Sequence, residues 1–203
     1  MYRNPYKGKF IVFEGLDGSG STTQASNLAH FLKSQKKRVQ QTKEPTSYLI
    51  GGLIRSWLAS DWSSSPICLQ LLFTADRAHH LEKEVIPMLK KGIYVISDRY
   101  FLSTLAFGAN DIPDRHWLKD INRNFLLPDL TFLIKVRPKV CIERISEGRN
   151  HFELYEKEEA LRKVERNYED FAKDYANIVR IDGEQEKDKV FENIKSHVIK
   201  RII

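Results

Sequence analysis

Glycines and residues with a hydroxyl side chain recur in residues 15–22, GLDGSGST, and their spacing is suited to a loop that binds phosphate. Glycine tolerates backbone angles that point successive N–H groups at one anion, and a helix beginning near Ser21 would add its unpaired N–H groups. The pattern G-x-x-x-x-G-K-[ST] is met at Gly15, Gly20 and Thr22, and Thr22 places a hydroxyl where the magnesium ion of a bound nucleotide would lie. The segment predicts an ATP site with Mg²⁺ as cofactor, formed by Gly15, Leu16, Asp17, Gly18, Ser19, Gly20, Ser21 and Thr22.

One position departs from this pattern, because Ser21 stands where a lysine is expected. That lysine would neutralise charge on the transferred phosphoryl group, so another cation must take its place if the loop serves phosphoryl transfer. An ordinary glycine-rich turn between a strand and a helix is the alternative. The apolar run before the loop, its two correctly spaced glycines and the amphipathic stretch after it favour nucleotide binding.

A carboxylate and a guanidinium are adjacent at the end of a second apolar run, residues 93–97. Asp98 could bind magnesium directly or through water, and Arg99 could hold a phosphate with two parallel hydrogen bonds. A structural ion pair at the end of a strand is the alternative. Because a parallel sheet would place both groups beside the phosphate loop, we interpret Asp98 and Arg99 as catalytic, with Thr22 and Asp98 as the metal ligands.

An aromatic ring and a guanidinium lie one helical turn apart at Phe73 and Arg77. Such a pair could stack on a planar base and hydrogen-bond its edge. Taken alone, the spacing is more typical of a core aromatic residue beside a solvated arginine. These two residues by themselves therefore do not indicate a base-binding site.

Five apolar runs alternate with amphipathic stretches and predict strands over residues 10–14, 38–43, 93–98, 130–136 and 178–182. Strands alternating with helices favour an α/β fold, a three-layer αβα arrangement with a five-stranded parallel sheet of the P-loop NTPase type. Ligands bind beyond the carboxyl ends of such strands. We predict one P-loop kinase domain, residues 1–203, in which the charged segment 144–158 is a short mobile lid.

The overall charge favours small acidic ligands over nucleic acid. The 203 residues carry a formal net charge of +6, but charges of both signs are interspersed, so we expect no nucleic-acid partner. Cys68 and Cys141 have neither metal-ligand spacing nor the number for a disulfide framework, which is typical of a cytoplasmic protein. No apolar run approaches the ~20 residues that cross a bilayer, so no membrane partner is expected.

Four motifs in order resemble those of thymidylate kinases: F-E-G-L-D-G-S-G-x-T-T-Q, K-E-P, F-T-A-D-R-A-x-H and V-I-S-D-R-Y-x-x-S-x-x-A-F. They span residues 10–107, and a basic flap and a final strand follow where that family has them. The resemblance implies transfer of the γ-phosphoryl group of ATP to dTMP, giving dTDP, with Mg²⁺ as cofactor. It also implies a homodimer, although the apolar residues of segment 66–89 could equally pack on the sheet.

The resemblance also implies how the base of the acceptor is bound. Phe73 would stack on thymine, while Arg77 and Thr104 would read the edge of the base. In this context the two residues that were inconclusive by themselves become candidate substrate contacts.

The sugar and phosphate of the acceptor have their own implied contacts. Asp17 would bind the 3′-hydroxyl, Arg99 the phosphate, and Phe107 would crowd the 2′ side of the sugar and favour deoxyribose. Lys43 matches a position where relatives commonly carry arginine, so its phosphate contact would be single rather than forked.

Three features depart from the family pattern. Ser21 replaces the loop lysine, and Gly108 stands where a glutamine often follows the aromatic residue. In the flap, either 152–153 or 155–156 could match the family's aromatic–glutamate pair. By the resemblance, a flap arginine serves the transferred phosphate; Arg149 is the candidate catalytic residue, with Arg144 behind it on ATP, and the turn 180–183 lines the adenine pocket.

Two other functions stay open at this point. One is a non-catalytic nucleotide-binding protein of the same fold that lost its lysine and kept a sensing role. The other is a kinase with a broader choice of acceptors, such as dUMP or a nucleoside. The retained acceptor residues argue against the first, and an arginine aimed at a second phosphate argues for a monophosphate over a nucleoside.

Overall fold

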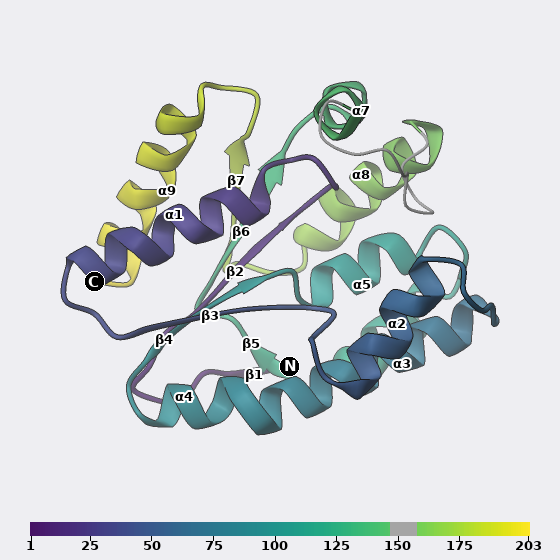
Figure 1. Cartoon of the computed structure of the whole chain (residues 1–203), viewed down its shortest axis with the longest axis horizontal. Coiled ribbons are helices and arrows are strands. Elements are labelled where there is room, and N and C mark those ends of the chain that lie inside the picture. Colours follow the sequence, from purple (N-terminus) through teal and green to yellow (C-terminus); the bar gives the residue numbers. More distant parts are fainter. Residues whose placement is uncertain (147–157) are drawn as a thin grey trace.

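The computed structural model describes residues 1–146 and 158–203 and centres on a five-stranded parallel sheet with strand order β3-β4-β2-β6-β7 (Figure 1). Four of the five predicted strands differ from the observed ones by one residue at one end, and the fifth agrees at both. The strands are β2 Phe10–Gly15, β3 Val39–Lys43, β4 Tyr94–Asp98, β6 Leu130–Lys135 and β7 Ile178–Asp182.

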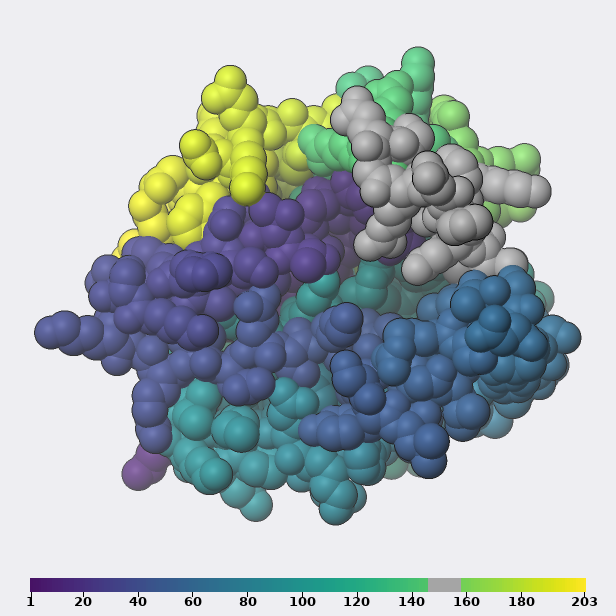
Figure 2. Space-filling view, in the orientation of Figure 1, coloured from purple at the N-terminus to yellow at the C-terminus, as the bar shows by residue number. Residues whose placement is uncertain are grey.

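Helices cover both faces of this sheet, which confirms the predicted three-layer arrangement (Figure 1). On one face α1, Ser21–Ser34, packs beside α9, Lys187–Arg201. Figure 2 shows the same pair as a yellow C-terminal segment against a purple N-terminal one. The other face is covered mainly by α4 Ile86–Lys90, α5 Phe101–Gly108 and α8 Glu158–Ala172.

A long helical segment leads toward the candidate site. It begins at α3, Pro66–His80, where the Ser65 hydroxyl accepts a hydrogen bond from the backbone N–H of Cys68 and proline occupies the first helical position. It continues through the π-helical turn η1, Leu81–Val85, into α4. The remaining helices are α2 Leu49–Leu58, which packs on α3, α6 Arg115–Asn122 and α7 Pro138–Ser146.

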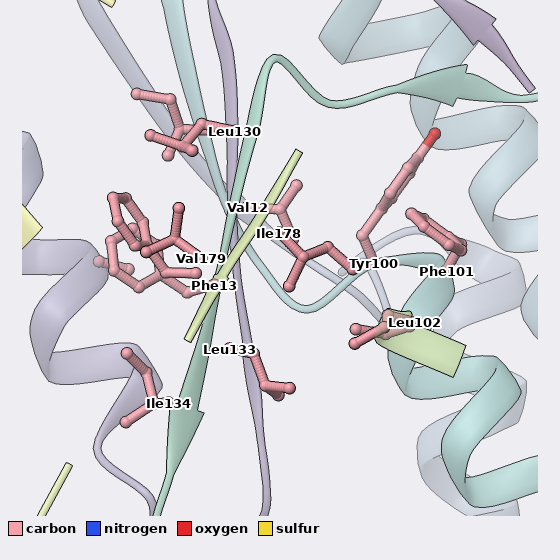
Figure 3. Packing of buried hydrophobic residues seen from close by; sticks show 14 of the residues in the cluster. Val12, Phe13, Tyr100, Phe101, Leu102, Leu130, Leu133, Ile134, Ile178 and Val179 are labelled. Atoms are coloured by element: carbon pink, nitrogen blue, oxygen red, sulfur yellow. The ribbon is translucent and has the colours of Figure 1, made fainter. Parts of the chain in front are cut away.

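Successive residues of the central strands point to opposite faces of the sheet (Figure 3). Phe13 and Ile134 lie on one side of the sheet, whereas Val12 and Leu133 lie on the other, near Leu102. Both β2 and β6 are buried on both faces, as strands of a covered parallel sheet must be. This packing holds the ends of β2 and β4 rigidly, and the candidate site begins there.

The structure also differs from the sequence-based expectations. A second, two-stranded parallel sheet pairs β1, Tyr2–Arg3, with β5, Leu126–Leu127; strands this short carry no periodic pattern that could have predicted them. Arg144, at the start of the predicted lid, lies in the last turn of α7. Residues 147–157, which include Arg149 and both candidate aromatic–glutamate pairs of the flap, lie outside the described residues. In the described part of the chain, no helix has the length and apolarity to cross a membrane.

Candidate active site

The loop between β2 and α1 has the backbone geometry of an anion cradle. Gly15, Gly18 and Gly20 have φ of 156°, 81° and 91°, angles that residues with a Cβ atom rarely adopt. A Cβ at Gly18 would also lie 2.5 Å from the carbonyl oxygen of Cys141. No side chain caps the first turn of α1, so its unpaired backbone N–H groups are available to bind a phosphate in the loop.

Asp98 lies opposite the start of α1 because β4 pairs with β2 in register, Phe13 beside Asp98. Ser21 Oγ donates to one carboxylate oxygen at 3.0 Å, and Thr22 Oγ1 donates to the other at 2.5 Å. The two expected metal ligands are therefore neighbours.

Magnesium fits this pair of ligands. In the described part of the chain no group of three or more His, Cys, Asp or Glu side chains could hold a metal by itself. Mg²⁺ usually keeps several waters and uses one or two protein oxygens together with substrate phosphates. The Thr22 hydroxyl and the Asp98 carboxylate supply oxygens of that kind.

Arg99 joins the phosphate loop to the sheet. Its Nη1 donates to the Gly15 carbonyl at 3.0 Å and to Ser103 Oγ at 2.9 Å, and its Nη2 contacts Asp17 Oδ1. The backbone of Arg99 has φ of 70°, a left-handed conformation that costs a non-glycine residue about 1 to 2 kcal/mol. The surrounding hydrogen bonds hold the residue in this strained position.

The Arg99 guanidinium still has donors available. In the part of the chain that the structure describes, Nε and one hydrogen of Nη2 have no partner, and 18% of the side chain is exposed. Two neighbouring N–H groups are the geometry in which arginine binds phosphate. The site could therefore hold an anion between Arg99 and the end of the phosphate loop.

An open cavity adjoins this arginine, between α3, α5 and the ends of β2, β3 and β4. The space within its lining, open solvent at the mouth included, is about 870 Å³. Three of its polar lining residues were assigned no role from the sequence: Glu44, Gln70 and Ser103. Every residue expected in the acceptor site lines it: Asp17, Lys43, Phe73, Arg77, Arg99, Thr104 and Phe107.

Arg77 lines the cavity, and only 1% of the residue is exposed. Its Nε donates to Glu44 at 2.9 Å, Nη1 to Asn122 at 2.5 Å and Nη2 to Thr104 Oγ1 at 2.6 Å. A buried arginine needs such a carboxylate partner, since an unpaired buried charge is costly. The spacing of Phe73 and Arg77 along the helix, taken alone, is typical of a solvated arginine, so it did not predict the burial of Arg77.

The sequence model of the thymidylate kinase family matches residues 13–194. The chain belongs to the thymidylate kinase family. It is 36% identical over 193 residues to a probable thymidylate kinase of Thermococcus kodakarensis, covering 91% of this chain and 94% of the relative. It is 37% identical over 196 residues (93% and 96%) to the thymidylate kinase of Carboxydothermus hydrogenoformans, and 34% identical over 197 residues (96% and 91%) to that of Plasmodium falciparum.

Arg144, the arginine that the resemblance to thymidylate kinases places near ATP, lies in α7. Its Nη2 donates to the Gly183 carbonyl at 3.1 Å. This contact brings Arg144 beside the turn 180–183 that the resemblance assigns to the adenine pocket. The lining of the cavity described above does not include Arg144.

Next to the cavity of this thymidylate kinase family member lies a carboxyl group to which the sequence analysis assigned no role. Glu14 is completely buried; its Oε1 accepts from the Tyr100 N–H at 3.0 Å, and its Oε2 accepts from the Ser103 hydroxyl. Burial raises the pKa of Glu14 to about 7, against the opposing effects of the Ser103 hydrogen bond and the Arg99 charge. A glutamate inside an otherwise apolar strand, FIVFEG, is the one sequence signal that could have indicated it.

We expect Glu14→Gln to change how stability depends on pH. Between its ordinary value of 4.5 and about 7, folded Glu14 holds a proton that the unfolded chain releases, so wild-type stability falls as pH rises through that window. The variant lacks this titration. In urea unfolding from pH 5 to 8, the free energy of unfolding of the variant relative to that of wild type should rise by on the order of 1 to 3 kcal/mol. If the difference between the two free energies did not change with pH, the raised pKa of a buried Glu14 carboxyl would be contradicted.

Proposed function

We propose that this chain is an ATP-dependent thymidylate kinase that transfers the γ-phosphoryl group of ATP to dTMP and forms dTDP. One observation supports this most: all seven residues expected for the acceptor line a single cavity, and Arg99 links that cavity to the phosphate loop. The relatives named above are thymidylate kinases, and they match this chain over nearly its whole length.

The geometry suggests how the two nucleotides would meet. The phosphates of ATP would lie against the N–H groups of the loop and the first turn of α1. The monophosphate of dTMP would be held by the free Nε and Nη2 donors of Arg99, with Lys43 as a second cation on the cavity wall. Phosphoryl transfer depends mainly on positioning and charge stabilisation, and both are supplied by groups held on rigid strand ends.

Magnesium would be held by Thr22 and Asp98, whose oxygens already face one another. When bound, the ion would neutralise charge that develops on the phosphate oxygens. The protein's own contribution is to hold these oxygens at the end of β4 and the start of α1. The resemblance to thymidylate kinases assigns the charge of the absent loop lysine to Arg149, which lies outside the described residues.

The alternatives can be separated by one panel of acceptors. ADP release, coupled to a reporter enzyme, would be measured with ATP and Mg²⁺ and with dTMP, dUMP, UMP or thymidine as acceptor. We expect dTMP to be fastest and thymidine to be inactive, because Arg99 requires an acceptor phosphate. No ADP release with any acceptor would indicate the non-catalytic nucleotide-binding protein, and release without an acceptor would indicate ATP hydrolysis. Equal rates for dTMP and dUMP would indicate the broader kinase.

Replacing Ser21 by lysine should tighten ATP binding by about tenfold or more, because a charged hydrogen bond to phosphate is worth about 1.5 to 3 kcal/mol when well placed. Ser21 faces Asp98 at the start of α1, so the longer side chain would begin beside the phosphate cradle. Calorimetric titration with a non-hydrolysable ATP analogue measures this. Weaker binding in Ser21→Lys would mean that the loop is shaped differently or that another cation already fills the space.

We also propose a cytoplasmic homodimer. The proposed dimer surface lies on α2 and α3, where four large apolar side chains are exposed: Leu49, Leu53, Ile67 and Leu71. Exposed apolar residues grouped on adjacent helices are typical of a surface that a second copy covers. Both cysteines are free thiols, which suits a reducing compartment.

A further inference from the structure

Gln70 belongs to the same helical face as two residues expected to bind the base. It precedes Phe73 by three residues and Arg77 by seven on α3, so all three side chains share one face. All three line the acceptor cavity. Gln70 is nevertheless 3% exposed, so its carboxamide lies in the wall rather than in open solvent.

The Gln70 carboxamide has an unmet hydrogen-bonding requirement. Its Oε1 is buried and has no hydrogen-bond partner among the residues that the structure describes. Buried amide groups are almost always paired, because leaving one unpaired is costly. A buried acceptor beside a ligand cavity is therefore suited to a partner that arrives with the ligand.

The space for this carboxamide exists because residue 108 is glycine. A Cβ at Gly108 would lie 2.8 Å from Gln70 Cδ and 3.0 Å from each of the two amide atoms. Gly108 ends α5, the helix that carries Thr104 and Phe107 on the opposite wall of the cavity. The two positions are sterically coupled: a side chain at 108 would push the carboxamide out of its place.

We propose that Gln70 determines base specificity by pairing with the ring edge of the acceptor pyrimidine, an assignment that rests on the proposed function. A ring stacked on Phe73 would have Arg77 on one side along the helix and Gln70 on the other. The imide edge of a thymine-type base presents one N–H donor beside carbonyl acceptors. Gln70 supplies an acceptor and a donor side by side, Oε1 for the ring N–H and Nε2 for a carbonyl.

The other polar groups of the wall do not meet this need equally well. Arg77 has donors but no acceptor. The oxygens of Glu44 already contact Arg77 and His80. Among these wall residues, Gln70 Oε1 is the uncharged acceptor that has no partner, so it is the best match for the ring N–H.

Gln70→Leu tests the proposal by calorimetric titration with dTMP. We expect dTMP to bind about tenfold more weakly, because a paired amide is replaced by an apolar group. The melting temperature of the unliganded variant should rise, because an unpaired buried amide is removed. A residue with a merely structural role would show the opposite: a lower melting temperature and unchanged dTMP affinity relative to wild type.

Two further variants keep the test specific. Gln24→Leu removes another buried glutamine with an unpartnered Oε1, on α1 outside the cavity, and should leave dTMP affinity unchanged. Gly108→Ala favours the helix but displaces the Gln70 carboxamide, so it too should weaken dTMP binding. Deoxyribose 5-phosphate, which lacks the base, should bind Gln70→Leu and wild type equally.

The outcomes separate the two proposals. If wild type binds dTMP and Gln70→Leu binds it equally well, the assignment of Gln70 is wrong while the proposed function stands. An equal loss of deoxyribose 5-phosphate affinity would place Gln70 at the sugar and overturn the base contact. If wild type does not bind dTMP at all, the proposed function fails and the assignment fails with it.

Discussion

Replacing Arg99 by lysine should lower kcat/KM for dTMP by about 10²- to 10³-fold, the loss typical of removing one preorganised donor to developing charge. Lysine keeps the positive charge but cannot make contacts to Gly15, Ser103 and Asp17 at once, as the guanidinium does. It would also lose the two remaining donors that suit a phosphate. Initial rates at varied dTMP with saturating ATP measure the effect.

The lysine substitution is chosen so that a loss of activity is not a loss of fold. Removing the charge altogether would leave Asp17 unpaired and change the surroundings of buried Glu14. Arg115 lies on α6 and forms an exposed ion pair with Asp170 of α8. Arg115→Lys is the matched control and should leave kcat/KM unchanged. If Arg99→Lys matched that control, Arg99 would not be the acceptor-phosphate ligand.

Replacing Arg149 by alanine should lower kcat by about 10³- to 10⁵-fold, with little change in dTMP affinity, because a supplied arginine contributes that much to phosphoryl transfer. The reason lies in the sequence: Ser21 and the loop residues Asp17, Gly18 and Ser19 supply no cation for the transferred group. Rapid-quench measurement of a single turnover would report the chemical step itself.

A combined variant makes the Arg149 prediction sharper. If Arg149 provides the charge that the loop lacks, adding Ser21→Lys to Arg149→Ala should recover part of the lost turnover. Arg162→Ala, which breaks an exposed pair with Glu158 on α8, is the control and should have no effect on kcat. An unchanged kcat in Arg149→Ala would remove this residue from the mechanism and direct attention to Arg144.

The sequence predicted the features of the fold that depend on a local pattern of residues. Apolar runs of the kind that a covered parallel sheet requires predicted the central strands β2, β4 and β6, and the glycine spacing predicted the loop that precedes α1. The resemblance to thymidylate kinases then indicated seven residues that prove to line one cavity. These residues come from separate segments, so their spacing along the chain could not group them. Only the resemblance to a known family could do so.

Long-range packing explains what the sequence could not show. Arg77 is buried because Glu44, 33 residues away, neutralises it, and helical spacing says nothing about that partner. Gln70 enters the cavity wall because α3 packs on α5 at a glycine. The pKa of Glu14 is raised because β2 is covered on both faces. Each depends on a contact between segments that are distant along the chain.

The most direct test of the central claim is a crystal structure with dTMP and a non-hydrolysable ATP analogue bound together. The account predicts the pyrimidine ring stacked on Phe73 between α3 and α5, and the acceptor phosphate on Nε and Nη2 of Arg99, facing the analogue in the loop 15–22. A pyrimidine bound elsewhere, or an acceptor phosphate that does not contact Arg99, would contradict it.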